Sequence, residues 1–215
     1  MIKTVSSITD LGVLYDRQLN FRDHYQSVVS KSNKAIFMLS KHFKFSSHKI
    51  KLMLYKTYIL PIVNYASSVW NPTKVRDIAF VEKVQRHATK YFILRNSNLN
   101  YYDRISNCNL ITLQTWKLIQ DLCLIYWIMN GIAGVLTPDV VNMQFSNSSH
   151  FEGNLLEKLC KTKTSRSKFA TRNIIVWNAL PYNIKNASNI VSFKLLLSKF
   201  YKHWLFYLLI YFFYL

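Results

Sequence analysis

Hydrophobic residues recur every three to four positions along most of the chain, which is the spacing of one face of an α-helix. The pattern predicts a mainly α protein, an amphipathic helical bundle. Ser46 or Ser47 is placed to cap a second helix, and Pro61 should kink or end that helix because proline lacks an N–H. The other expected helices are residues 22–43, 74–94 (after a Thr73 cap), 101–107, Leu113 up to Gly131, and Asn189 to about Trp204.

Two of these helices have an apolar face and a separate basic face. The apolar face of residues 22–43 holds Tyr25, Val28, Val29, Ser32, Ile36, Leu39 and Phe43, and that of residues 74–94 holds Ile78, Val81, Val84, Ala88 and Tyr91. The helix after Leu113 is apolar almost all round, which is typical of a buried core helix. We therefore expect Trp116 and Trp127 in the core.

The remaining segments lack helical periodicity. Leu11-Gly12-Val13-Leu14 predicts a short buried strand without a sheet partner, and residues 158–172 predict an irregular basic loop. The uncharged tail 205–215 would span only about 17 Å as a helix, short of a hydrocarbon core of about 30 Å. The expected ranges are 1–21 (extended segment), 22–132 (helical domain), 133–204 (C-terminal region) and 205–215 (tail outside the fold).

The net charge of the chain indicates a class of binding partner. Lys and Arg number 28 against 10 Asp and Glu, a formal net charge of +18, and a polyanion such as nucleic acid relieves the resulting self-repulsion. The alternative is an ordinary solvated basic surface. Three scattered cysteines favour neither a disulfide framework nor a zinc site. The candidate nucleic-acid-binding residues are Lys31, Lys34, Lys41, Lys83, Arg86 and Lys90, with Lys161, Lys163, Arg166 and Lys168 as a second patch.

A series of short motifs resembles the C-terminal part of reverse transcriptases from non-LTR retrotransposons, the jockey-like LINE elements in particular. The resemblance runs from about residue 5 to residue 204. Its motifs are Asp10-Leu11-Gly12-Val13, Phe21-Arg22-Asp23-His24, Leu54-Tyr55-Lys56, Leu60-Pro61-Ile62, Tyr65-Ala66-Ser67, Trp70-Asn71-Pro72, Glu82-Lys83-Val84-Gln85-Arg86, Ala88-Thr89-Lys90, Trp177-Asn178-Ala179-Leu180-Pro181, Ser192-Phe193-Lys194 and Trp204.

The resemblance implies a palm-exit remnant (residues 1–21) followed by a helical thumb, the part that holds the primer–template duplex. It also implies that the first helix lacks the palm on which its apolar face would pack. The family's RNA-directed DNA polymerase activity uses Mg²⁺ held by clustered aspartates, whereas no two of the seven aspartates here are adjacent. We therefore expect a truncated copy with no catalytic residues, no metal site and no cofactor.

The expected function is sequence-independent binding of an RNA or DNA backbone, with the rest of a retroelement polymerase as a possible partner in trans. A membrane partner is not expected, and the expected location is the cytoplasm or nucleus. One alternative is a helical interaction or membrane-surface protein that uses the basic face and the apolar tail. Another is a decayed copy with no function.

Overall fold

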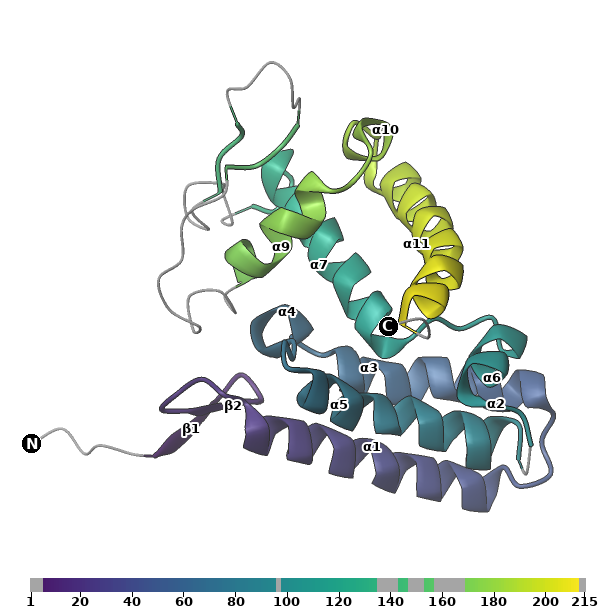
Figure 1. Cartoon of the computed structure of the whole chain (residues 1–215). Coiled ribbons are helices and arrows are strands. Elements are labelled where there is room, and N and C mark those ends of the chain that lie inside the picture. The colour runs from purple at the N-terminus through teal and green to yellow at the C-terminus, as the bar shows by residue number, and fades with distance from the viewer. Residues whose placement is uncertain (1–5, 96–97, 135–142, 147–152, 157–168, 213–215) are drawn as a thin grey trace, which may run out of the picture. The chain divides into compact units, whose positions relative to one another are not determined.

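The chain is mainly α-helical, as the hydrophobic spacing predicts. The computed structural model describes residues 6–95, 98–134, 143–146, 153–156 and 169–212, with backbone alone from residue 202 onward. In chain order (Figure 1) the elements are β1 (Ser7–Asp10), β2 (Val13–Asp16), α1 (Arg22–His42), α2 (His48–Leu54), the π-helical turn η1 (Tyr55–Ile59), α3 (Leu60–Asn64), α4 (Ser67–Trp70), α5 (Val75–His87), the π-helical turn η2 (Ala88–Ile93), α6 (Tyr101–Asn107), α7 (Leu113–Met129), α9 (Phe169–Asn178), α10 (Tyr182–Lys185) and α11 (Ile190–Phe212).

The N-terminal strands form a hairpin. β1 pairs antiparallel with β2, from Ser7 opposite Asp16 to Asp10 opposite Val13. Leu11 and Gly12 make the turn with φ of 44° and 79°, the left-handed region that glycine adopts readily. A strand does begin at Val13, which is buried, but two parts of the prediction for residues 11–14 are wrong: Leu11 lies in the turn and is 82% exposed, and the strand has a partner.

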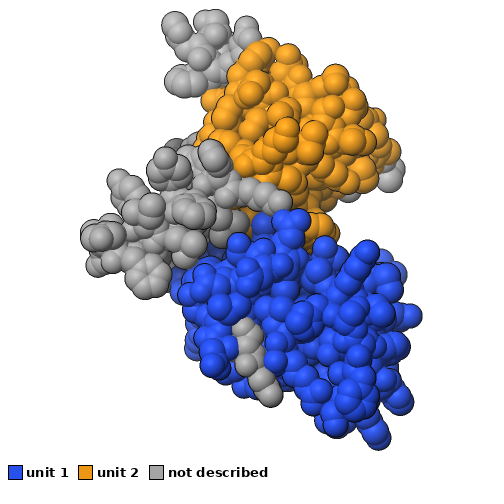
Figure 2. Space-filling view, turned by 90° about the vertical axis from the view of Figure 1, so that its right-hand side faces the viewer, with its two compact units in different colours: residues 1–114 blue, residues 115–215 orange. Residues whose placement is uncertain are grey.

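The structure groups the chain into two compact units, residues 1–114 and 115–215 (Figure 2). In the first unit the apolar face of α1 is buried from Tyr25 to Leu39 against the helices that follow it. That face was expected to be partly without a packing partner. From Tyr25 to Leu39 it has partners within the chain itself, because α3, α5 and both π-helical turns pack against α1.

The two π-helical turns explain two further differences. Pro61 does not end the helical segment: α2, η1 and α3 follow without a break, and Pro61 lies in the first turn of α3. A π-helical turn contains one extra residue, so the register shifts after it. In η2 this shift exposes Tyr91, which was expected in the core, and buries Phe92 and Ile93 in its place.

Helix ends follow the predicted caps with one exception. Ser47 accepts from the N–H of Ile50, Asn189 accepts from that of Ser192, and Gly131 lies past the end of α7 with φ of 68°. The exception is Thr73, because α5 begins one residue later, with Lys74 as its N-cap and no side-chain cap bond.

The second unit contains most of α7 together with α9, α10 and α11. The ring of Tyr126 stacks on Phe193 of α11, 4.5 Å between centroids, and its hydroxyl donates to the carbonyl of Ala187. Helix α7 therefore packs with residues that follow it, whereas the sequence-based ranges placed it with those before it. Trp116 and Trp127 lie on its open side, 39% and 38% exposed, so their assignment to the core is wrong.

No helix within the described residues is both long enough and apolar enough to cross a membrane. The helix α11 extends through most of the apolar tail, to Phe212.

Candidate nucleic-acid interface

Three of the predicted basic residues lie along one side of α1. Lys31, Lys34 and Lys41 are all exposed, on the side of the helix opposite its buried face. They extend over roughly 15 Å of helix axis. Each lysine has a flexible apolar stem and a hydrated ammonium group, so the three charges can adjust to an extended anion.

The other predicted cations of the first unit lie on α5 and η2. Lys83, Arg86 and Lys90 are exposed, opposite the buried Val81, Val84 and Ala88. Two of them point over aromatic rings of their own helix: the Lys83 ammonium is 5.6 Å from the Phe80 centroid, and that of Lys90 is 5.3 Å from the Tyr91 centroid. These interactions are weak at an exposed site and leave both ammonium groups accessible.

Arg86 differs from the lysines. Its guanidinium lies 4.1 Å from the centroid of Tyr101, a close cation–π contact with a buried ring, and its charge acts on nearby Glu82. Arg86 therefore helps to hold α5 against α6, and it is a weaker candidate for binding than Lys83 or Lys90.

Helices α1 and α5 lie side by side and run in the same direction (Figure 1). Their N-terminal turns meet at one end, and further along a hydrogen bond joins the side chains of Asn33 and His87, 3.1 Å apart. Lys83 and Lys90 are four residues before and three after His87, so they share its side of α5. The structure thus brings the two basic faces onto one pair of adjacent helices.

The first turns of this helix pair hold two arginines that are not among the residues predicted from sequence. Arg22 of α1 and Arg76 of α5 line a pocket of about 240 Å³ together with Tyr25, Gln26, Phe80 and the acidic Asp77. Arg76 also pairs with the neighbouring Asp77, 3.6 Å away. The signal for Arg76 was its position seven residues before Lys83, on the same helical face; nothing in the local sequence marks Arg22 as its neighbour.

Three acidic side chains in the described part of the chain have a structural role. Asp16 accepts from the backbone N–H groups of Gln18, Asn20 and Phe21, and so holds the turn before α1. Glu82 and Asp121 are buried. Cations are buried as well, namely Lys51, Arg104 and Lys117.

Glu82 lies at the centre of a buried polar network under the basic face of α5. Its carboxylate accepts from the Tyr101 hydroxyl and from the backbone N–H groups of Leu113 and Gln114, at 3.1 and 3.4 Å. Gln85 donates to Tyr101 and to the carbonyl of Ile111. Burial raises the pKa of Glu82 despite these donors. The network fixes the start of α7 and the position of α6 relative to α5.

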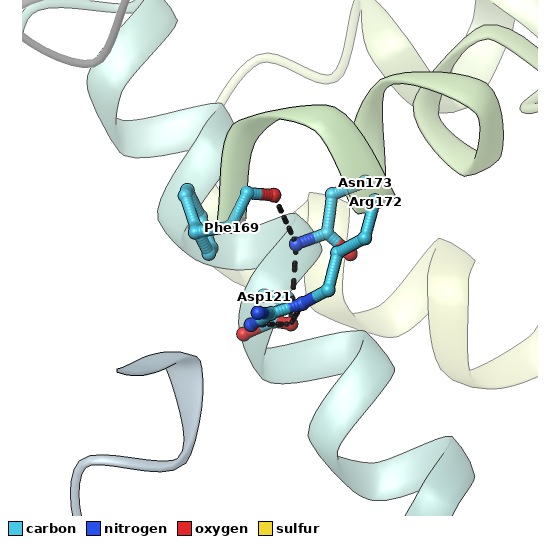
Figure 3. Close-up of polar contacts among 4 residues, drawn as sticks. All are labelled: Asp121, Phe169, Arg172 and Asn173. Carbon is cyan, nitrogen blue, oxygen red and sulfur yellow. Dashed lines mark hydrogen bonds and ion pairs between the residues drawn. The ribbon is translucent and has the colours of Figure 1, made fainter. Parts of the chain in front are cut away.

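The second predicted patch, Lys161, Lys163, Arg166 and Lys168, lies outside the described residues. Arg172, at the end of the expected basic loop, is instead in α9. Figure 3 shows its guanidinium against the fully buried Asp121 of α7, 3.0 Å away, with Asn173 donating to the same carboxylate oxygen. Arg172 is therefore a structural residue of the second unit, and the expectation of a loop through residue 172 is wrong from Phe169 onward.

Several motifs of the family resemblance are also structural. The indole of Trp70 is buried, donates to the carbonyl of Tyr65 and packs edge-on against His24. Asn178 bonds both backbone groups of Leu155 through its side-chain amide. These side chains stabilise the fold. Other residues of the motifs, among them Lys83 and Lys90, are exposed and belong to the candidate interface.

No group of three or more His, Cys, Asp or Glu side chains capable of holding a metal ion occurs among the residues that the structure describes.

Comparison with known proteins shows similarity to a nematode protein. The chain is 26% identical over 185 residues to the uncharacterized protein B0403.1 of Caenorhabditis elegans, and the alignment covers 85% of this chain and 91% of that protein. No protein-family model matches the chain, and no solved structure matches it.

Proposed function

We propose that the chain binds the sugar–phosphate backbone of nucleic acid, without reading base sequence, through the exposed cations of α1 and of α5 with η2. In this proposal the helix pair corresponds to the thumb of a non-LTR retrotransposon reverse transcriptase. The chain holds a duplex and performs no catalysis. The resemblance of its motifs to that family motivates the choice of a primer–template duplex as ligand.

One observation supports the proposal above the others: five lysines of two sequence segments lie exposed on one pair of parallel helices. They are Lys31, Lys34, Lys41, Lys83 and Lys90. Like charges on neighbouring helices repel each other, and phosphates remove that repulsion while releasing counterions from the nucleic acid.

The type of residue also fits a backbone ligand. Lysine is a point charge without the planar fork that arginine uses to read guanine, so a lysine surface favours phosphate binding over base readout. The two arginines at the N-terminal end, Arg22 and Arg76, extend the same basic surface to a pocket large enough for a phosphate group. Such a surface positions a duplex and carries no sequence information.

The test is the salt dependence of binding to a mixed-sequence RNA–DNA duplex, measured by fluorescence anisotropy on the full chain. The double variant Lys34→Gln/Lys83→Gln removes two charges of the proposed interface. For each phosphate that the variant no longer neutralises, the slope of log K against log salt should become less steep by about 0.9. The matched control, Lys49→Gln/Lys199→Gln, removes two exposed lysines from α2 and α11, so its net charge falls by the same amount.

The proposal requires the interface variant to lose more affinity and more slope than the control. Equal losses in the two variants would show that only overall charge matters, and absence of binding by the wild-type chain at low salt would refute the proposal outright.

A further inference from the structure

The second unit has a pocket of about 350 Å³ on the open side of α7, within the size range of small-ligand sites. Trp116, Ile119, Cys123 and Trp127 line it from α7, at successive positions of one helical face. Lys194 and Ser198, one turn apart on α11, line it from the other side. All of these residues belong to a single unit of the chain.

The walls of this pocket contain two partly exposed tryptophans. Two tryptophans, about three turns apart on α7, are each more than a third exposed although the helix is otherwise among the most apolar in the chain. A half-exposed indole presents a flat face on which a nucleobase can stack, whatever the base. Two such rings at the two ends of one pocket provide a stacking surface.

Lys194 is the charged residue among those that line the pocket, beside the polar Gln120 and Ser198. The ammonium of Lys194 lies 5.9 Å from the Trp127 centroid, and Lys194 is itself exposed. The ion pairs among the described residues join Arg76 to Asp77 and Arg172 to Asp121, and neither involves Lys194. The pocket therefore combines flat aromatic walls with one positive charge beside them, which matches a planar aromatic group joined to an anion.

We propose that this pocket binds an unpaired nucleotide of single-stranded nucleic acid, with the base against an indole and its phosphate beside Lys194. The inference rests on the proposed function, since the ligand is a segment of the same polymer, but it assigns a second site with different chemistry. The helix pair of the first unit holds a duplex by charge, whereas the pocket of the second unit holds a single strand chiefly by stacking. Arranged in this way, the chain distinguishes paired from unpaired segments.

The test titrates the full-length chain with an oligothymidylate of about 12 nucleotides, within the range of single-strand site sizes, and follows tryptophan fluorescence. Stacking should quench the emission of the wild-type chain. The variant Trp127→Leu should lose about tenfold or more in single-strand affinity, and Trp127→Phe should recover part of it because phenylalanine still offers a flat face. Binding to the RNA–DNA duplex should stay within about twofold of wild type in both variants, because the first unit holds the duplex through its phosphates.

The control is Tyr182→Leu, which removes an exposed aromatic ring of α10 away from the pocket residues. It should leave single-strand affinity unchanged. The circular dichroism spectrum and the thermal midpoint of each variant establish that the fold is intact.

Three results would overturn the inference. Wild-type binding to duplex without binding to oligothymidylate would remove the single-strand site and leave the proposed function standing. Equal loss of duplex and single-strand affinity in Trp127→Leu would show that the pocket does not distinguish the two. Quenching by laurate, without quenching by oligothymidylate, would assign the pocket to an apolar anion instead.

Discussion

Glu82 joins three parts of the first unit through one carboxylate: α5, which carries it, the Tyr101 hydroxyl of α6, and the first N–H groups of α7. Removing this carboxylate leaves buried donors without an acceptor. We expect Glu82→Ala to lower the free energy of unfolding by about 2–4 kcal/mol in urea titrations. The exposed neighbour Lys83→Ala should change it by less than about 0.5 kcal/mol. A small effect of Glu82→Ala would mean that water replaces the carboxylate without cost.

The raised pKa of Glu82 gives a second prediction at this scale. A carboxyl group with a higher pKa in the folded state holds its proton longer there, so folding loses stability as the pH rises through the interval between the two pKa values. The lower limit of that interval is the ordinary pKa of 4.5, and its upper limit is the raised pKa of Glu82 in the folded state. Glutamine at position 82 cannot ionise. The difference in unfolding free energy between Glu82→Gln and wild type should therefore move in favour of Glu82→Gln as the pH increases through this interval, measured by urea titration at a series of pH values. A constant difference would contradict the assignment.

The buried pair of Asp121 and Arg172 makes the corresponding prediction for the second unit. Leaving a buried charge without its partner costs about 3–5 kcal/mol. Arg172→Met should therefore greatly increase hydrogen exchange in α7 and α9, the two helices that the pair joins.

The double variant Asp121→Leu/Arg172→Met is the control, since it removes both charges together. It should recover part of the missing protection, because the carboxylate is removed together with its guanidinium partner, while Asn173 loses this acceptor. Equal exchange in the single and double variants would mean that the ion pair contributes little.

At the scale of elements, the π-helical turn η2 acts as an insertion of one residue in an otherwise continuous helix. Deleting the exposed Tyr91 should let the helix continue with α-helical geometry and keep Phe92 and Ile93 in the core. We expect the deletion to cost less than about 2 kcal/mol in urea titrations.

The matched control deletes Ala79, an exposed residue in the regular part of α5. That deletion rotates every later core residue of the helix by about 100° and should cost more than about 4 kcal/mol. Similar losses of stability from the two deletions would show that η2 does not absorb a change in register.

The elements that sequence could predict were those with local causes. Periodic apolar residues predicted α1 and α5, an almost wholly apolar run predicted α7, and short polar side chains predicted the caps at Ser47 and Asn189. The errors have a non-local cause. Which side of α7 is exposed depends on where α11 packs, and Trp116 lies on the exposed side. A helix that is apolar almost all round has no polar face from which this side could be predicted.

The candidate site was predictable to a similar extent. Exposure of Lys34 and Lys83 followed from their spacing relative to the core face. Helices α1 and α5 are separated in sequence by α2, α3 and α4. Their packing side by side, and the shared pocket of Arg22 and Arg76, are therefore long-range contacts. No local pattern contains that information.

For the whole molecule, the excess of positive charge should make stability depend on ionic strength. A net charge of +18 on 215 residues destabilises the compact state, and salt screens that repulsion. The midpoint of thermal unfolding should rise when sodium chloride increases from low to physiological concentration, as followed by circular dichroism. A midpoint that falls or stays constant would show that favourable ion pairs outweigh the repulsion.

The separation between buried fold-stabilising side chains and exposed lysines has an evolutionary consequence. Trp70, Glu82 and Gln85 hold the fold together, so a homologous chain that must still fold retains them, whether or not it binds anything. Selection for binding would act elsewhere, on Lys31, Lys34, Lys41, Lys83 and Lys90. Among homologous sequences, amino-acid changes at these five positions should be rarer than at equally exposed lysines if the interface is in use. Equal rates would mean that the fold is retained while the interface is not under selection for binding.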